Sequence, residues 1–112
     1  MIQVAGKLTV PVAGTPEQLF ALLDQTRFRF KTFQSVLLQA IFSNTGKIYI
    51  GEEGMNKTTF ENCAAVLVIP SASGIPSFGA SNPVAPAGID LTALYLDADV
   101  SGEGVLCTLL VS

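Results

Sequence analysis

Alternating oxygen-bearing side chains near the end of the sequence match the opening of a calcium-binding loop. Asp97, Asp99 and Ser101 occupy every second position, and Gly102 stands sixth, where such loops turn sharply. The bidentate glutamate that should close the coordination sphere is replaced by Thr108, and the sequence predicts no flanking helices. We therefore expect an acidic turn between two strands here rather than a calcium site.

Asp97 and Asp99 could instead act as a pair of catalytic carboxylates, because alternate residues of a strand point to the same face of a sheet. Such catalysis needs an apolar wall that raises the pKa of one carboxyl group. Two acids beside a solvated turn have no such wall, so we interpret the pairing as chance.

Residues 51–58 partly match the phosphate-binding loop GxxxxGK[ST]. The pattern requires a glycine directly before the lysine, but Asn56 precedes Lys57 in this sequence. Glu52 and Glu53 would also repel phosphate groups. We interpret the segment as a loop that follows a strand.

The composition of the 112-residue chain excludes several kinds of catalytic and metal site. Without histidine there is no imidazole base, no Ser-His or Cys-His nucleophile and no ordinary zinc site, so we expect neither enzyme activity nor a cofactor. The net charge of −3 argues against nucleic-acid binding, which needs a basic surface. A carbohydrate-binding module is disfavoured because tryptophan is absent and only Tyr49 and Tyr95 could present polar-tipped rings.

Charged residues are scarce and unevenly distributed. They make up 13% of the chain, against about 25% in ordinary soluble domains, while 49% of the residues are apolar. A small domain is mostly surface, so we expect partner subunits to cover much of it. Residues 1–47 carry five basic and two acidic side chains, a balance of +3, and residues 48–112 carry one basic and seven acidic ones, a balance of −6. Faces of opposite charge would suit docking between copies of the chain.

The sequence shows no targeting or membrane segment. Residues 1–4 lack the basic start of a signal peptide, and Lys7 interrupts any apolar run. The long uncharged stretch from residue 62 to residue 89 is broken by prolines and glycines, so we expect no membrane span. Without an export signal, Cys63 and Cys107 are expected to be buried free thiols.

Short β-rich runs separated by turns predict one all-β domain over residues 1–112, an antiparallel β-sandwich or jelly-roll-like barrel. Strands are expected at residues 3–12, 33–42, 47–51, 63–69, 94–98 and 105–111. We expect one hairpin across the turn at 43–46 and a second across the turn at 99–104. Residues 15–24 stay open between a helix start and a short bent strand.

Cations and aromatic rings alternate over residues 27–31. In a strand, Phe28 and Phe30 would face the core, and Arg27, Arg29 and Lys31 would face solvent. The functional alternative is that these three cations form a basic stripe that docks on an acidic partner subunit.

The Pro/Ser/Ala/Gly-rich segment 70–88 is the longest part of the sequence for which we expect no regular element. It contains no charge, and it exceeds the usual loop of about 12–15 residues. It is either a surface excursion or an arm that orders against a neighbouring subunit, and the absence of charge favours the arm. The partner-contacting residues expected in it are Ile75, Pro76, Phe78, Val84 and Pro86.

Three segments of the chain resemble sequences of small virion proteins of tailed bacteriophages. They are AGTPEQL at 13–19, AIFSNTGKIYIG at 40–51, and IDLTALYLDA at 89–98 followed by GEGV at 102–105. They cover much of the chain in the expected order, and they consist of turns and strands rather than catalytic residues. The resemblance implies a β-sandwich structural protein in which the segment around Thr15 is a strand.

The same resemblance implies a capsid decoration (cement) protein, made in the bacterial host cytoplasm and located on the capsid surface of the virion. Such a protein self-associates as a homotrimer and bridges neighbouring copies of the major capsid protein without catalysing a reaction. A tail, baseplate or head-fibre component of the virion stays open as the alternative.

Overall fold

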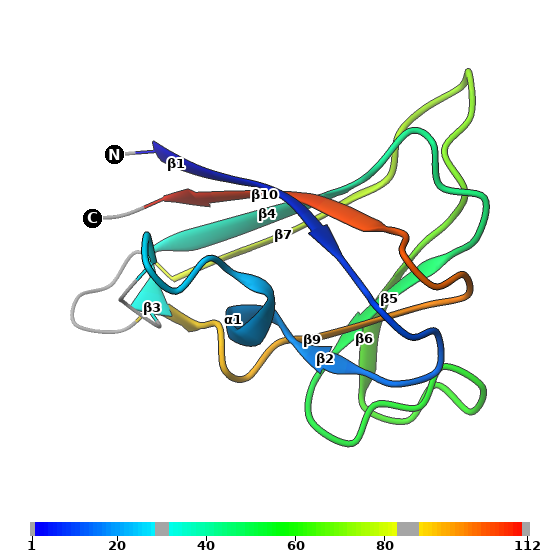
Figure 1. Cartoon of the computed structure of the whole chain (residues 1–112), viewed down its shortest axis with the longest axis horizontal. Coiled ribbons are helices and arrows are strands. Elements are labelled where there is room, and N and C mark those ends of the chain that lie inside the picture. The colour runs from blue at the N-terminus through cyan, green and yellow to red at the C-terminus, as the bar shows by residue number, and fades with distance from the viewer. Residues whose placement is uncertain (1, 29–31, 83–87, 111–112) are drawn as a thin grey trace.

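Two four-stranded antiparallel sheets lie on either side of the hydrophobic core (Figure 1). The computed structural model describes residues 2–28, 32–82 and 88–110 and is mostly β, as the turn-rich sequence predicts. No sheet among these residues closes into a barrel. The radius of gyration is 13.3 Å, close to the value of about 13 Å expected for a single domain of this length.

The first sheet, sheet A, has the strand order β1-β10-β4-β7. Its strands are β1 (Ile2–Thr9), β4 (Ser35–Ala40), β7 (Ser77–Ser81) and β10 (Gly104–Leu110). In β4, Val36, Leu38 and Ala40 are buried and the residues between them are more exposed. Sheet A therefore packs one face on the core and turns the other outward.

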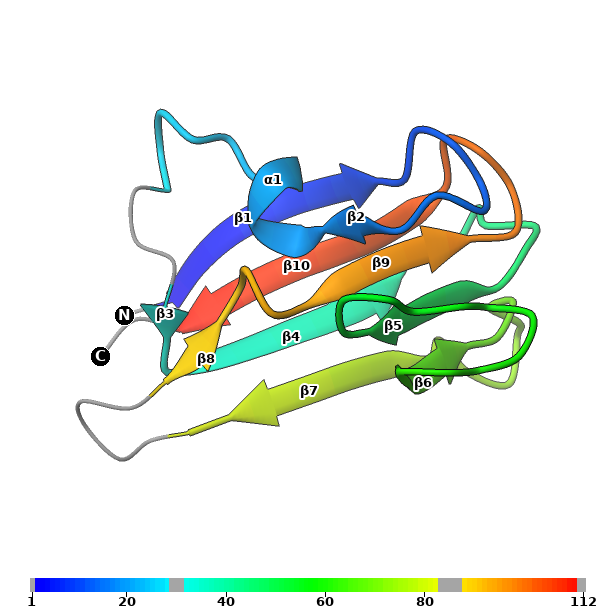
Figure 2. The same cartoon turned by 90° about the horizontal axis from the view of Figure 1, so that it is seen from below.

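The second sheet, sheet B, has the strand order β2-β9-β5-β6. Its strands are β2 (Glu17–Gln18), β5 (Ile48–Gly51), β6 (Cys63–Leu67) and β9 (Tyr95–Ala98). All four residues of β5 are buried, because the loop 52–62 folds back over the outer face of this sheet (Figure 2). Tyr49 on β5 and Met55 in the loop are 6% and 5% exposed.

A helical turn and a two-stranded pair lie at one end of the core (Figure 2). These elements are α1 (Leu19–Leu22), β3 (Thr32–Phe33) and β8 (Ile89–Asp90). They add Leu19, Phe20 and Phe33 to the buried cluster. No helix among the described residues is long and apolar enough to cross a membrane.

Residues 15–24, which the sequence leaves open between helix and strand, contain both. The two residues of β2 pair with Leu96 and Tyr95 of β9, and α1 follows directly. The strand that the resemblance implies around Thr15 is therefore wrong at Thr15 itself, which lies in a bend; only Glu17 and Gln18, just after it, form a strand. Helical spacing of the apolar residues lets a single turn bury both Leu19 and Phe20.

Both hairpins expected from the sequence are wrong, because each pair of strands is divided between the two sheets. β4 belongs to sheet A and β5 to sheet B, whereas β9 belongs to sheet B and β10 to sheet A. The turns at 43–46 and 99–104 are therefore corners that carry the chain from one sheet to the other.

Side chains from the two corners hold them against each other. The buried Asn44 donates from Nδ2 to the carbonyl oxygen of Gly104 at 2.8 Å, and its Oδ1 accepts from the Gly104 N–H at 3.4 Å. The Glu103 carboxylate accepts from the backbone N–H groups of Thr45 and Gly46 at 2.7 and 2.9 Å. Asn44 and Gly104 are 60 residues apart, so the local turn signals could not distinguish a corner from a hairpin.

The uncharged segment 70–88 contains a strand that the sequence does not predict. β7 pairs with β4 over its whole length, from Ser77 opposite Gln39 to Ser81 opposite Ser35. The expectation of no regular element is therefore wrong for residues 77–81. The strand is hard to recognise in the sequence because its outward residues are serine and glycine, which are typical of turns, and its inward residues give only a short apolar alternation.

Other expected elements agree better with the structure. β1 and β6 confirm the strands expected near residues 3–12 and 63–69. Phe28 is buried as predicted, but it lies in a turn in which the carbonyl oxygen of Asp24 accepts from the N–H groups of Arg27 and Phe28. Phe30 lies outside the described residues.

The two cysteines are free thiols, as predicted, but only Cys107 is fully buried. Burial raises the pKa of the Cys107 thiol to about 12. Cys63 is half-buried on β6, and its thiol contacts the carbonyl oxygens of Ile50 and Ala65 at 3.7 and 3.6 Å.

Alkylation of the folded protein with iodoacetamide is expected to label Cys63 and to spare Cys107. The thiolate is the reacting form of cysteine, and burial suppresses it at Cys107. Mass spectrometry should find one label per folded chain and two labels after unfolding in denaturant. Two labels at similar rates in the folded protein would contradict the burial of Cys107.

Candidate functional site

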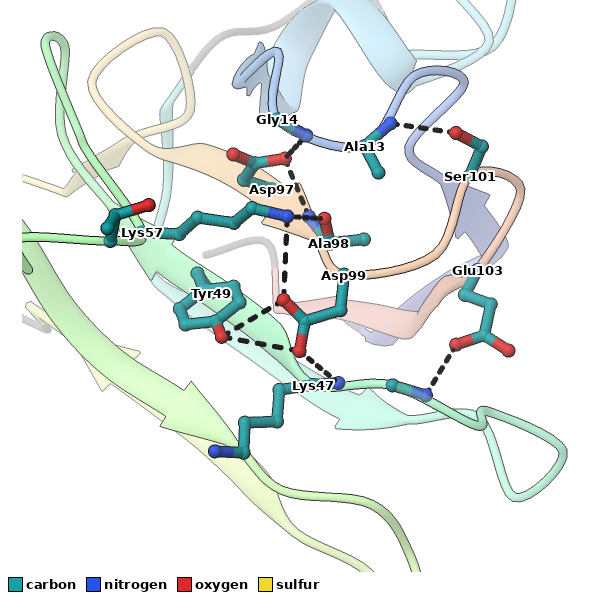
Figure 3. Close-up of polar contacts among 12 residues, drawn as sticks. Ala13, Gly14, Lys47, Tyr49, Lys57, Asp97, Ala98, Asp99, Ser101 and Glu103 are labelled. Atoms are coloured by element: carbon teal, nitrogen blue, oxygen red, sulfur yellow. Dashed lines mark hydrogen bonds and ion pairs between the residues drawn. The ribbon is translucent and has the colours of Figure 1, made fainter.

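Asp97 is the most deeply buried acid among the described residues and holds two parts of the backbone together (Figure 3). It lies on β9 with 1% of its surface exposed. Its Oδ1 accepts from the N–H of Gly14 at 2.8 Å and from the N–H of Ala98 at 2.7 Å. The expectation of two solvated surface acids is therefore wrong for Asp97. Met55 and Lys57 of the loop 52–62 line the same small pocket as Asp97, which a local sequence pattern does not reveal.

Asp99 connects β5 and the loop 52–62 to the second corner. Its carboxylate accepts from the Tyr49 hydroxyl at 3.1 Å and from the backbone N–H of Lys47 at 3.3 Å (Figure 3). Lys57 Nζ lies 3.4 Å from the same carboxylate and donates to the carbonyl oxygen of Ala98 at 2.8 Å. Burial alone would raise the pKa of Asp99, but these hydrogen bonds outweigh it and lower the pKa below its ordinary value.

The same contacts explain two other pKa shifts. Burial, and then the hydrogen bond to Asp99, raises the pKa of Tyr49. Partial burial would raise the pKa of Glu103, but hydrogen bonds from Thr45 and Gly46 lower it overall. Each carboxylate is therefore stabilised in its charged form by groups that it holds in place.

The arrangement of these acids suits structural support rather than acid–base or metal chemistry. Asp97, Asp99 and Glu103 each bind backbone N–H groups of a different segment. Among the described residues, no three cysteine, aspartate or glutamate side chains gather closely enough to hold a metal ion. The segment 51–58, which partly matches a phosphate loop, instead contributes Lys57 to the clamp on Asp99.

Stability is expected to fall in acid because of Asp99 and Glu103. Their folded-state pKa values lie below the unfolded values of about 3.9 and 4.3, so their contribution is present at neutral pH and is lost as pH falls below about 4. The melting temperature, followed by circular dichroism from about pH 6 to about pH 3, should decline less steeply in the D99N/E103Q variant. Parallel curves for the variant and the parent would contradict this assignment.

A shallow cleft of about 460 Å³ lies between the loop 52–62 and residues 93–94. Its walls are mostly small or apolar, and its described lining is Gly51, Glu52, Asn62, Cys63, Ala64, Ala93 and Leu94. The Asn62 amide donates to the carbonyl oxygen of Glu53 at 3.2 Å, and the Cys63 thiol faces carbonyl oxygens of its own sheet. These polar groups bind the chain itself, so the cleft suits an apolar group better than a substrate that needs chemistry.

An apolar tip, defined here as Val68, Ile69 and Ile75, protrudes at the end of β6 and before β7. These side chains are 54%, 48% and 43% exposed and line a groove of about 320 Å³ with Pro76. Residues 62–89 carry no charge, so no charged side chain of this segment interrupts the tip. Phe42 is 67% exposed two residues beyond Ala40, whose N–H donates to the carbonyl oxygen of Pro76 at 3.0 Å.

The structure brings only part of the predicted contact set together. Ile75 and Pro76 lie at the tip, whereas Phe78 is half-buried on β7 and packs against the core. Arg27 lies apart from them: its guanidinium donates to the carbonyl oxygen of Val4 at 3.2 Å and lies 4.8 Å from the centre of the Phe28 ring. The remaining predicted contacts, Arg29, Lys31, Val84 and Pro86, lie outside the described residues.

Two kinds of candidate site residue are not predicted from the sequence. Phe42 is one of them, because phenylalanine is usually buried and its type gives no sign that it is 67% exposed. Asn44 and Glu103 look like ordinary turn residues, and no local pattern shows that they bind each other's turn. The structure also leaves little support for carbohydrate recognition, because Tyr49 is buried and Tyr95 is half-buried.

Comparison with known proteins gives no further assignment: the chain matches no family model, no curated protein and no solved structure.

Proposed function

We propose that this chain is a non-enzymatic structural protein of a tailed-bacteriophage particle that decorates the capsid and bridges neighbouring copies of the major capsid protein. The observation that carries the proposal is the apolar tip, which exposes Val68, Ile69 and Ile75 on an uncharged segment. Exposed apolar patches free of charge are typical of contact surfaces between proteins. The resemblance to virion proteins supplies the partner, and no nucleic acid, membrane or cofactor is required.

We also infer that the two sheets form a β-sandwich with jelly-roll winding. The support is the pairing of strands: β1 with β10, β2 with β9, β4 with β7, and β5 with β6. These four pairs are nested in sequence, as in one long hairpin that has been rolled up, and they give the two sheet orders described above. Jelly rolls of this kind recur in viral capsid domains.

Self-association as a homotrimer would strengthen attachment to the capsid. A tip of three large side chains is small compared with the roughly 800 Å² per partner of a standard protein interface. Three such contacts acting together bind far more tightly than one. The trimer would thus allow a small protein to stay on the virion through individually weak contacts.

The tip can be tested with purified particles of the phage that encodes this chain. After removal of the native protein, wild-type protein is expected to rebind on the order of hundreds of copies, visible as density on the capsid in cryo-electron microscopy. I75D should reduce bound copies at least tenfold, because a buried unpaired charge is costly. V12D is the matched control, since Val12 is 55% exposed in a turn outside the tip, and it should bind like wild type.

Two results would count against the proposal. Equal binding of I75D and wild type would remove the tip as the contact surface. A copy number of about a dozen or fewer, with density at the tail or at single head positions, would favour a tail, baseplate or head-fibre component instead.

A further inference from the structure

In the part of the chain that the structure describes, the outer face of sheet A is uncovered and almost free of charge. Twelve positions of its four strands face outward in three rows; eleven of them carry a side chain, and only that of Lys7 is charged. They form three rows across the order β1-β10-β4-β7, which are Ile2, Leu110, Ser35, Ser81; then Val4, Thr108, Leu37, Gly79; then Lys7, Leu106, Gln39, Ser77.

Large aliphatic side chains of this face are unusually exposed. Ile2, Val4, Leu37 and Leu106 are 68%, 61%, 46% and 44% exposed. The register places Val4 and Leu37 on either side of Thr108, so these residues form a continuous surface. The outer face of sheet B is different, because the loop 52–62 covers it and buries Tyr49 (Figure 2). The described residues thus cover the outer face of sheet B and leave that of sheet A exposed.

We propose that the outer face of sheet A packs against the same face of a second copy of this chain. The two copies are related by a two-fold axis that lies between the sheets and runs parallel to the strands. This rotation reverses the strand order, so β1 lies over β7 of the second copy and β10 lies over β4. Contacts of this kind are self-complementary, as two-fold interfaces require.

The distribution of side-chain size supports this pairing. The outward row of β7 consists of Ser77, Gly79 and Ser81, whereas β1 presents Ile2 and Val4 opposite it. Large side chains of one copy therefore fill the space left by small ones of the other, at the distance of about 10 Å at which sheets pack.

On the central strands, Leu110 of one copy lies over the small Ser35 of the other and Leu37 lies over Thr108, whereas Leu106 meets the aliphatic stem of Gln39. Lys7 lies at the edge, over Ser77, where its ammonium group reaches solvent, and the two Lys7 side chains are at opposite edges. An axis perpendicular to the strands would instead place β1 on β1 and β7 on β7. The small outward residues of the two β7 strands would then face each other and leave a gap at that edge.

The size of the face sets the strength expected of the contact. Four strands about 4.8 Å apart, each contributing about 20 Å of length, give a footprint of roughly 400 Å². This is about half of the roughly 800 Å² per partner in stable interfaces. We therefore expect association that depends on protein concentration.

Sedimentation equilibrium over a concentration series tests the proposal. Wild-type protein should reach an even number of chains, and the L37K/L106K variant should have half that mass, because lysine ammonium groups would be buried without partners. V12K, exposed elsewhere, should retain the wild-type mass. If the homotrimer also forms, the masses fall from six chains to three; if it does not, they fall from two to one. A wild-type assembly with an odd number of chains, or an unchanged mass in L37K/L106K, would overturn the proposal.

Cysteine cross-linking tests the direction of the axis. Facing positions of two packed sheets lie about 10 Å apart, beyond the reach of a direct disulfide, so a short bismaleimide cross-linker is used. In a C63S background, V4C/G79C should then form a covalent dimer, whereas V4C alone and G79C alone should not. Within one chain these positions are three strands apart, about 14 Å, so the facing pair of the second copy is the nearer target. A dimer formed by V4C alone would place β1 on β1, and no dimer from V4C/G79C would exclude the pairing of β1 with β7.

Discussion

Replacing Gly104 with alanine is expected to destabilise the protein by about 3 kcal/mol or more and to lower its melting temperature by roughly 10–20 °C. Gly104 begins β10 beside β1, and a Cβ atom there would overlap the carbonyl oxygen of Leu8 and lie 2.7 Å from the Cα of Thr9. Both obstacles are backbone atoms, so no side-chain rotation relieves the clash. The Asn44 contacts to Gly104 would be displaced as well. Thermal unfolding followed by circular dichroism measures the change.

Gly79 on β7 provides the matched control. It also lies in a strand of sheet A, but a Cβ atom there would meet Leu37 Cδ1 at an ordinary distance of 3.8 Å. G79A is therefore expected to change stability by less than about 1 kcal/mol, and to raise it if anything, because glycine weakens a strand. Similar melting temperatures for G104A and G79A would show that sheet A can shift to make room.

Replacing Asp97 with alanine is expected to cost about 3 kcal/mol. The substitution leaves the N–H groups of Gly14 and Ala98 without their acceptor in a site that is 1% exposed. Chemical denaturation with urea measures the loss as a lower midpoint. The turn that contains Gly14 should also become more open to proteolysis, because Asp97 holds it to β9.

Asp97→Asn separates hydrogen bonding from charge. Asparagine keeps an oxygen where Oδ1 accepts both bonds, so we expect D97N to lose only about 1 kcal/mol. Equal losses in D97A and D97N would mean that the negative charge, rather than the acceptor, stabilises this site.

Many of the strands could be predicted because local patterns of apolar and polar residues indicate them. Alternating apolar residues mark β4, and apolar runs bounded by polar turns mark β5 and β6. β7 lacks such a pattern. Its outward residues Ser77, Gly79 and Ser81 are small and have low β propensity, and only Phe78 and Ala80 face the core. Its strand form depends on hydrogen bonds to β4, which are a property of the folded sheet.

The partners of the strands could not be predicted from the same patterns. The turn at residues 43–46 has the composition of a hairpin turn, yet its geometry depends on Asn44 reaching Gly104 and on Glu103 reaching Thr45. The bond from the Gly14 N–H to Asp97 likewise joins segments that are 83 residues apart. Contacts between distant segments decided these outcomes, and a single sequence does not display them.

The acids could be recognised from the sequence as candidates, but their role could not. Spacing predicted that Asp97 and Asp99 lie on one strand and that their pairing is chance, but β9 ends at Ala98 and Asp99 lies in the bend that follows. Only the folded chain shows that Asp97 is buried and binds the N–H of Gly14 and that Asp99 accepts from the Tyr49 hydroxyl. The apolar tip was better marked, since the absence of charge over residues 62–89 is visible in the sequence itself.

The central position of β10 in sheet A has a consequence for biosynthesis. β10 pairs with β1 on one side and β4 on the other, and Ile2 lies opposite Leu110. While the chain is being translated, β1 and β4 have no strand between them until the last part of this sequence leaves the ribosome. Unpaired apolar strand edges promote aggregation, and contacts between distant residues form slowly. Before β10 inserts, little charge keeps the incomplete chains apart. A chaperone that covers the edges of β1 and β4 in this period, or slower synthesis that lowers the number of such chains present at once, is therefore expected to increase the yield of folded protein.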